Sequence, residues 1–230
     1  MAYLKKNHAG KLAAMSILFV LATLNCLNVQ SVRAVTISQS TFAETPLSAF
    51  EGIYQNKTNT FFYFKITING TGLLAKQMDG DRQIILTRKT DLGFEMKDDD
   101  GDENIAVTFS KNDAGEITGV VVGNNQDQWI RVKEYVPAKE ITLTVDQLKA
   151  FEGKYKFEER DDAYLQITAT ATGLTLKQLW DNREFNFTPI SDVDFLNKQA
   201  AFPLKFTKDG TGTVTKVLAF NRDLWDKVKE

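Results

Sequence analysis

The residue types that carry most protein chemistry are scarce in this 230-residue sequence and unevenly placed. Its only histidine, His8, and its only cysteine, Cys26, both fall within the first 34 residues. A chain without imidazole cannot build a Ser-His-Asp triad or use a histidine base, and a chain without His or Cys lacks the usual zinc ligands. If the first 34 residues are removed, we therefore expect no catalytic residue, no metal site and no cofactor in the remainder.

Those 34 residues have the three parts of a secretory signal peptide. Several lysines precede an apolar run over residues 12–24, and Ala34 marks the expected cut, with Ala43 as a second choice. The apolar run is shorter than the ~20 residues that a spanning helix needs. We therefore expect a periplasmic or secreted protein of bacterial type, with no membrane span after cleavage. A retained membrane anchor is the alternative interpretation.

The charge left after cleavage argues against two classes of partner. Removing the four basic residues of the first 34 from the 28 in the whole chain leaves 24, against 30 acidic residues, a net charge of −6. Nucleic-acid binding needs clustered cations that neutralise phosphates, and an anionic membrane surface repels an acidic protein. We expect neither partner.

Carboxylate pairs support the one hydrolytic chemistry that needs no histidine. Two acidic pairs occupy equivalent positions in the repeat described below, Glu51 with Glu152 and Asp91 with Asp192. Each stands at a helix end or in a turn, which explains it as a local hydrogen-bond acceptor. The acidic run 98–103 does not fit the EF-hand calcium loop, because its spacing puts a methionine at the first ligand position. A carboxylate-dependent hydrolase remains an alternative function.

Four residues are candidates for ligand binding. Trp180 has no aromatic counterpart in the first copy of the repeat and stands next to a turn. Arg183 lies close by and matches Arg82 of the first copy. An aromatic ring at a hairpin tip beside a guanidinium group suits a sugar or a peptide, although packing within the protein explains the ring equally simply. Tyr155 completes the set, although its recurrence as Tyr54 favours a role in the fold.

The region that must position these residues is a tandem duplication. Leu47–Tyr54 (LSAFEGIY) matches Leu148–Tyr155 (LKAFEGKY), and the shift of 101 residues continues without a gap to Phe94 and Phe195, with 18 of 48 positions identical. Such internal repetition indicates two copies of one unit. The predicted organisation is a signal peptide over 1–34, a linker over 35–44, one repeat over 45–134, a linker over 135–145 and a second repeat over 146–230.

Each copy begins with a short helical signal and continues as short strands. Thr45 and Pro46 suit the start of the first helical turn, and Thr144 or Asp146 that of the second. Beyond these turns apolar residues alternate with polar ones, and Asn-Gly and Asp-Gly turns separate the runs. About eight strands per copy predict an all-β protein of two small antiparallel meander barrels, with filled interiors favoured by the short strands. Fusion of the copies into one larger barrel is the alternative.

The motifs carry a family resemblance. The opening Leu-x-x-Phe-Glu-Gly-x-Tyr, the Thr-Gly-Leu that follows it and the turns at Asp91–Phe94 and Asp192–Phe195 resemble a lipocalin-like β-barrel domain. That domain, of unassigned function, lies behind serine β-lactamase-like and penicillin-binding-protein-like hydrolases. The resemblance covers both copies, whereas the hydrolase and its Ser-x-x-Lys motif are missing. It implies a barrel fold, a location outside the cytoplasm and an accessory role.

Together these features predict an exported, non-enzymatic binding protein. The expected partner is an envelope glycan, a small apolar molecule or a partner protein. An accessory subunit that acts in trans on a serine hydrolase is an alternative. The interior of the barrels discriminates between ligand classes: an apolar cavity of about 300 Å³ or more would favour lipid-like cargo, and a filled interior would favour surface recognition.

Overall fold

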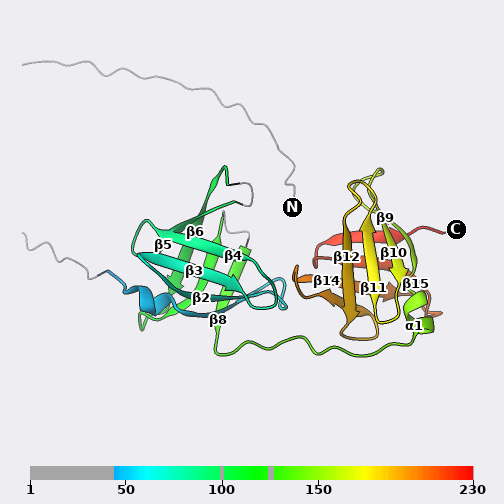
Figure 1. Ribbon diagram of the computed structural model, residues 1–230, viewed down its shortest axis with the longest axis horizontal. Helices are drawn as coiled ribbons and strands as arrows, with labels where there is room; N and C mark the ends of the chain where they lie inside the picture. The colour runs from blue at the N-terminus through cyan, green and yellow to red at the C-terminus, as the bar shows by residue number, and fades with distance from the viewer. Residues whose placement is uncertain (1–43, 99–100, 124–126, 230) are drawn as a thin grey trace, which may run out of the picture. The chain divides into compact units, whose positions relative to one another are not determined.

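The computed structural model describes residues 44–98, 101–123 and 127–229. Two closed antiparallel barrels of eight strands each follow one another in the sequence (Figure 1). The prediction of two tandem all-β barrels is confirmed, and the alternative of one fused barrel is wrong, because each sheet closes on itself. The signal peptide, both cleavage positions, His8 and Cys26 lie outside the described residues.

Barrel 1 is a meander in which each strand pairs with the next and the last pairs with the first. A 3-10 helix, η1 (Leu47–Phe50), precedes its strands. The strands are β1 (Gly52–Asn56), β2 (Tyr63–Asn69), β3 (Gly72–Gln77), β4 (Gln83–Arg88), β5 (Gly93–Lys97), β6 (Asn104–Lys111), β7 (Ile117–Val122) and β8 (Asp127–Val132).

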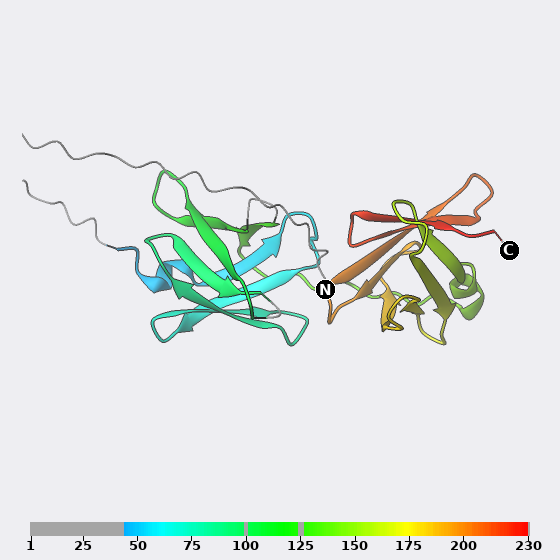
Figure 2. The ribbon, with the colours of Figure 1, turned by 90° about the horizontal axis from the view of Figure 1, so that it is seen from above.

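Barrel 2 repeats this order, and here a five-residue α-helix, α1 (Val145–Lys149), comes first. Its strands are β9 (Gly153–Phe157), β10 (Tyr164–Ala169), β11 (Leu174–Gln178), β12 (Glu184–Pro189), β13 (Asp194–Asn197), β14 (Phe202–Lys208), β15 (Val214–Ala219) and β16 (Asp223–Lys227). Figure 2 shows strands at the front of each barrel crossing those behind it, as the tilt of a closed barrel requires.

Alternation along the strands gives each barrel its own core. The inward residues form two separate clusters, one around Tyr54, Phe94 and Phe109 and one around Tyr155 and Phe195. The burial pattern of β3, with buried and more exposed residues taking turns, is typical. Because both cores are built from apolar side chains, burial of hydrophobic surface stabilises each barrel without a disulfide among the described residues.

The recurring Phe-Glu-Gly-x-Tyr motif closes one end of each barrel, which we call the helix end. In barrel 1 the buried hydroxyl of Tyr54 donates to the carbonyl of Phe50 at 2.8 Å, and a carboxylate oxygen of Glu51 accepts the backbone N–H of Ile68 at 3.2 Å. Both bonds therefore tie the helical turn to the strands, and the two bonds recur in barrel 2.

In barrel 2 the same bonds link Tyr155 to Phe151 at 2.8 Å and Ala169 to Glu152 at 2.8 Å. Burial raises the pKa of Tyr54 to about 12, against a smaller opposing effect of the Arg131 charge, and burial also raises the pKa of Tyr155. The neutral phenol is thus the form that each folded barrel holds.

The glycine of the motif is needed because a basic side chain crosses it. A Cβ added to Gly52 would lie 2.7 Å from Nε of Arg131, and one added to Gly153 would lie 2.8 Å from Cε of Lys227. Both glycines have φ values that L side chains rarely adopt, +156° and +141°. The basic group reaches over the glycine to the helical turn, and Lys227 donates to the carbonyl of Ala150 at 3.1 Å.

Local details at the start of barrel 1 differ from the sequence prediction. Thr45 does not cap the helical turn: its hydroxyl donates to Asp91 at 2.9 Å, and its backbone N–H donates to the same carboxylate at 2.6 Å. These bonds lower the pKa of Asp91, with Lys111 adding to the effect. In barrel 2, Thr144 does cap α1, accepting from the backbone N–H of Gln147.

Alternation of apolar and polar residues over 62–68 predicts Phe62, Phe64, Ile66 and Ile68 on the inner face, and this pattern fails at two positions. Ile68 is 45% exposed, because it lies near the end of β2 beyond the packed core, and Tyr63 on the outer face is buried. The ring of Tyr135, from the segment after β8, packs edge-on against Tyr63 with centroids 5.1 Å apart. A residue of the predicted linker therefore covers this part of the outer face.

Candidate ligand-binding cavity

The end of barrel 1 opposite the helical turn, which we call its mouth, opens into an apolar cavity of about 90 Å³. Its lining runs from fully buried Tyr54, through the half-buried Phe62 and Ile84, to the exposed Arg82. This gradient of burial shows that the cavity leads from the core to solvent. Most of the exposed lining surface is apolar, so the cavity suits an apolar group rather than an ion.

Aromatic rings and a thioether form one wall of this cavity. Trp129 packs edge-on against Phe62 at a centroid distance of 4.9 Å, and its ring centroid lies 5.2 Å from that of Phe64. Met96 also lines the cavity. The indole Nε1 of Trp129 is buried and has no hydrogen-bond partner among the described residues. The indole Nε1 of Trp225 in barrel 2 is likewise buried without a partner in the described part of the chain, so this feature is common to both barrels.

Polar groups stand at the rim of the cavity. Asp127 lines it, and Asn56, 5% exposed, donates through its side-chain amide to the Asp127 carboxylate. The side-chain oxygen of Asn56 accepts the backbone N–H groups of Thr58 at 3.0 Å and Asn59 at 2.7 Å. The β1–β2 loop is thus held beside the rim, so that this part of the mouth has a fixed geometry.

Barrel 2 fills its corresponding mouth with phenylalanines. The ring of Phe202, 2% exposed, packs edge-on against Phe187 and Phe185 at 5.1 and 5.7 Å. Phe220 stacks on Phe202 with centroids 3.6 Å apart and planes 14° from parallel. Packed side chains therefore fill the mouth of barrel 2, as the sequence predicted for both barrels. The mouth of barrel 1 differs, because it contains a cavity.

The four predicted ligand-binding residues are dispersed. Arg82 lines the barrel 1 cavity. Tyr155 is fully buried in barrel 2, where its hydroxyl serves the fold. Trp180 is 50% exposed and stacks on Trp225 with centroids 6.0 Å apart, and Arg183 pairs with Asp181 at 3.4 Å. The structure therefore places one of the four, Arg82, at the cavity.

Sequence reasoning missed the residues that shape the cavity. Neither Trp129 nor Phe62 is among the candidates that the sequence indicates. The available signal was a difference in side-chain size between the copies, such as Ile84 opposite Phe185 and Ala75 opposite Leu176. Equivalent positions that carry small residues in one barrel and large ones in the other mark where interior volume differs.

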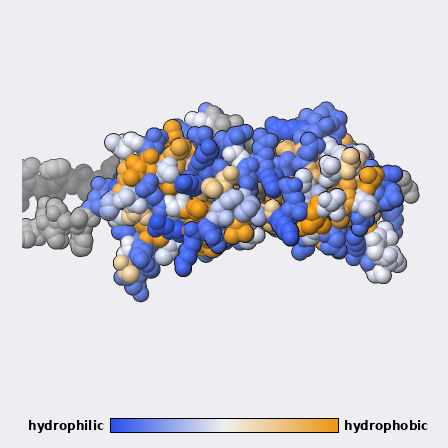
Figure 3. Space-filling view, turned by 60° about the horizontal axis from the view of Figure 1, so that its bottom comes forward, coloured by the Kyte–Doolittle hydropathy of each residue, from blue (hydrophilic) through white to orange (hydrophobic). Residues whose placement is uncertain are grey.

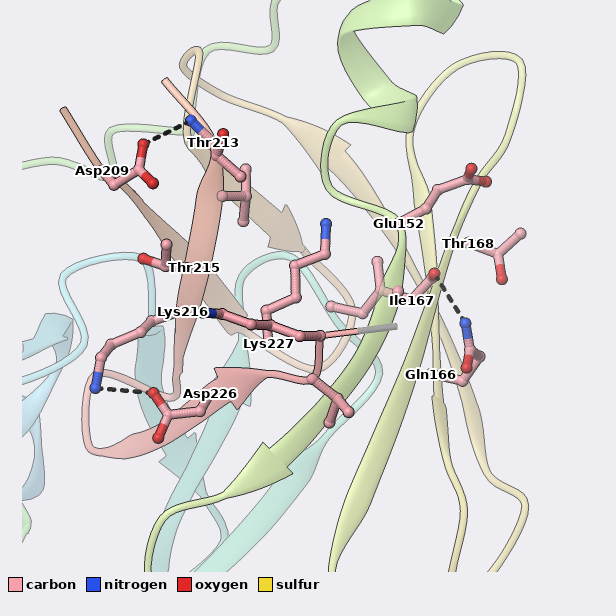
Figure 4. Close-up of a pocket in the computed structure, with 14 residues that line it drawn as sticks. Glu152, Gln166, Ile167, Thr168, Asp209, Thr213, Thr215, Lys216, Asp226 and Lys227 are labelled. Atoms are coloured by element: carbon pink, nitrogen blue, oxygen red, sulfur yellow. Dashed lines mark hydrogen bonds and ion pairs between the residues drawn. The ribbon is translucent and has the colours of Figure 1, made fainter. Parts of the chain in front are cut away.

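A wider groove of about 940 Å³ lies on barrel 2 (Figure 4). Most of its charged side chains are engaged with the protein. Lys216 pairs with Asp226 at 2.9 Å and with Glu158 at 2.5 Å, and Asp209 accepts the backbone N–H of Thr213 at 3.0 Å. Glu152, as described above, holds a backbone N–H of β10. Because these groups already serve the fold, the groove defines no ligand chemistry.

On the face that Figure 3 shows, hydrophobic residues occur in small groups among polar ones and form no extended apolar patch. Within the described ranges, no three His, Cys, Asp or Glu side chains gather in a way that could hold a metal ion. In the same part of the chain, none of the helices has the length and hydrophobicity required to traverse a bilayer.

The fold defines the chain as a tandem of eight-stranded antiparallel barrels, one with an open apolar mouth. Comparison with models of known protein families and with curated proteins finds no match. The cavity and its surroundings are therefore the basis for a functional proposal.

Proposed function

We propose that this chain is an exported, non-enzymatic binding protein that holds an apolar part of its ligand in the mouth of barrel 1. The observation that carries the proposal is the cavity of about 90 Å³ beside Trp129, open to solvent and lined mainly by apolar side chains. Binding pockets are concave and mostly apolar with a few polar groups, and here Arg82 and Asp127 supply those groups at the rim.

The size of the cavity limits what can enter. It equals about three water molecules at ~30 Å³ each, well below the ~300 Å³ at which whole drug-sized ligands begin to fit. A complete lipid chain is therefore disfavoured. The cavity suits a group of a few heavy atoms, with the rest of the ligand outside the rim.

The chemistry of the described residues supports binding rather than catalysis. Three of the four recurring acids, which would have to serve a carboxylate mechanism, act within the fold: Glu51 and Glu152 accept backbone N–H groups, and Asp91 binds Thr45. The bonds from Thr45 lower the pKa of Asp91, so this carboxyl group is a poor proton donor.

The test uses the three tryptophans as reporters. Nitrogen-15 NMR resolves indole N–H signals, which substitution of each tryptophan by phenylalanine assigns. The protein is titrated with toluene, cyclohexane and octanoate in turn. Binding of any of them at the mouth shifts the Trp129 signal and leaves that of Trp225 in place. If none of the three shifts the Trp129 signal at concentrations up to their solubility, the proposal is wrong.

A matched pair of variants locates the binding. Ile84→Phe introduces at the cavity the residue that barrel 2 has there, and we expect at least a tenfold loss of affinity. Ile85→Phe makes the same chemical change on the outer face, where Ile85 is 63% exposed, and should leave affinity within twofold. Equal effects of the two substitutions would place binding elsewhere.

A further inference from the structure

The β7–β8 hairpin of barrel 1 and the β15–β16 hairpin of barrel 2 each carry, at the mouth, one residue that is equivalent between the two barrels. Val120 pairs with Trp129 in barrel 1, and Val217 pairs with Trp225 in barrel 2. Three residues after these valines stand Gly123 and Phe220, whose backbone N–H groups donate to Ala106 at 2.8 Å and to Pro203 at 3.1 Å. Because Ala106 and Pro203 are themselves equivalent, so are Gly123 and Phe220.

Both residues have a left-handed backbone, with φ of +67° at Gly123 and +52° at Phe220. Glycine adopts this conformation freely, whereas for a bulky residue it is an outlier. Barrel 2 therefore holds a phenylalanine in an unfavourable conformation. Phe220 and the next residue, Asn221 (φ +57°), lie in the tight turn between β15 and β16, in which the N–H of Arg222 donates to Ala219 at 3.1 Å. This turn presents the ring of Phe220 to Phe202, on which it stacks at the mouth of the barrel.

Phe220 thus acts as an aromatic occupant that belongs to the protein itself. Its ring packs against the core cluster of barrel 2, and the guanidinium of Arg222 lies 5.9 Å from its centroid. Gly123 provides no side chain at the equivalent position of barrel 1, and a Cβ added to it would meet no atom of the described residues within 4 Å. The duplicate shows which kind of group this mouth accommodates when it is filled.

The wall of the barrel 1 cavity favours the same kind of group. Aromatic rings prefer edge-on or offset neighbours, and thioethers make favourable contacts with ring edges. The cavity offers Phe62, Phe64, Trp129 and the sulfur of Met96.

We propose that the mouth of barrel 1 binds a small aromatic molecule by one benzene-sized ring, in the place that Phe220 occupies in barrel 2. This inference rests on the proposed function and names the ligand class. A closed cavity of ~150 Å³ is known to hold benzene. The cavity here is smaller, about 90 Å³, but open, so the ring enters edge-first and keeps its substituents at the rim beside Arg82.

The first experiment compares ligand shapes in the titrations described above. We expect toluene to bind at least tenfold more tightly than cyclohexane or octanoate, because only an aromatic ring gains edge-on contacts with the aromatic side chains of the cavity. If cyclohexane or octanoate binds as tightly as toluene or more tightly, the ligand class is wrong while the proposed function stands. If no probe binds, both fail.

The second experiment transfers the occupant between barrels. Gly123→Phe gives barrel 1 the residue of barrel 2, and we expect it to weaken toluene binding at least tenfold. Gly123→Ala imposes the same left-handed strain without a ring, and should leave toluene binding within threefold. Equal losses in the two variants would show that strain, and not occupancy by the ring, weakens binding, and would overturn the inference.

The reverse exchange provides an independent check. Phe220→Gly removes the ring from barrel 2 and relieves the backbone strain, so we expect a second toluene site that shifts the Trp225 signal. Circular dichroism establishes that the variant is folded. A folded Phe220→Gly protein that binds toluene only at Trp129 would show that Phe220 does not occupy a ring site.

Discussion

At the helix end of each barrel, one phenylalanine of the helical turn packs among two others in nearly the same geometry. The ring centroid of Phe50 lies 5.2 and 4.8 Å from those of Phe94 and Phe109. That of Phe151 lies 5.0 and 4.7 Å from those of Phe195 and Phe206. At the mouths, by contrast, the side chains diverge in both directions: Phe185 replaces Ile84 and Phe220 replaces Gly123, whereas Ala163 replaces Phe62.

The conserved helix ends and the divergent mouths show that the two ends of the barrel meet different requirements. The helix end closes the barrel and holds the residues that recur in both copies, so it serves the fold. The mouth varies in volume while the barrel closes all the same, so its side chains are available for another task. The comparison leads to three predictions about stability, which test whether the two helix ends are equivalent.

The largest effect is expected from emptying the aromatic cluster at the helix end. Phe50→Ala and Phe151→Ala each remove a fully buried ring and should each cost about 3–5 kcal/mol of unfolding free energy. Urea unfolding, followed through the indole signals of Trp129 and Trp225, measures the loss in the affected barrel. A loss in one barrel less than half that in the other would break the equivalence of the helix ends.

An intermediate effect is expected from the buried tyrosines at alkaline pH. Burial raises the pKa of Tyr54 from 10.0 to about 12, so the unfolded chain ionises first. The stabilisation is complete below about pH 10 and is lost as pH rises toward 12, a change of about 2–3 kcal/mol. Tyr54→Phe and Tyr155→Phe should each reduce this pH dependence in their own barrel. In barrel 1 a part of it remains, because burial also raises the pKa of Tyr63 and of Tyr135.

The measurement is urea unfolding of the two variants and the parent at pH 9 and pH 11.5. Each variant also loses the hydrogen bond to Phe50 or Phe151, which lowers its stability at both pH values alike. Only the difference between the two pH values reports ionisation. A parent-like pH dependence in both variants would mean that other groups cause the alkaline loss.

The smallest effect on stability is expected from the basic residue that crosses the glycine, because this residue differs between the two helix ends. Arg131 donates to the carbonyls of Ala49 at 3.2 Å and Ile117 at 3.3 Å and also to that of Glu51, and its counterpart Lys227 reaches Ala150. We expect Arg131→Ala to cost about 1–2 kcal/mol and Lys227→Ala less than about 1 kcal/mol. The same unfolding assay ranks the two, and a reversed order would contradict the assignment.

Much of the fold could be predicted from the sequence, because alternation and turn residues act locally. The repeat identified equivalent positions, and the predicted eight strands of each copy are confirmed. The burial of Tyr63 could not be predicted in this way, since its cover comes from Tyr135, 72 positions later in the sequence. Likewise Thr45 could not be assigned to Asp91, because that bond depends on where a distant turn returns.

The site was harder to predict than the fold for a physical reason. A cavity is the volume left by side chains from several strands, so no local pattern encodes it. The equivalence of Gly123 and Phe220 emerges only from strand register, and the conformation that makes Phe220 unusual is a property of the backbone. Arg82 was a candidate for a different reason, its match to Arg183. The structure places it at the barrel 1 cavity, whereas the sequence did not indicate the residues around it.

The closure of both sheets has a consequence for how this protein meets other molecules. Every strand in each barrel has hydrogen-bonded neighbours on both sides, but β4 pairs with β5, and β12 with β13, through only two residue pairs each. Outside these two seams, a foreign peptide finds few unpaired strand residues that it could join as an additional strand. Closure of each sheet therefore limits self-association through stacked strands to the same two seams.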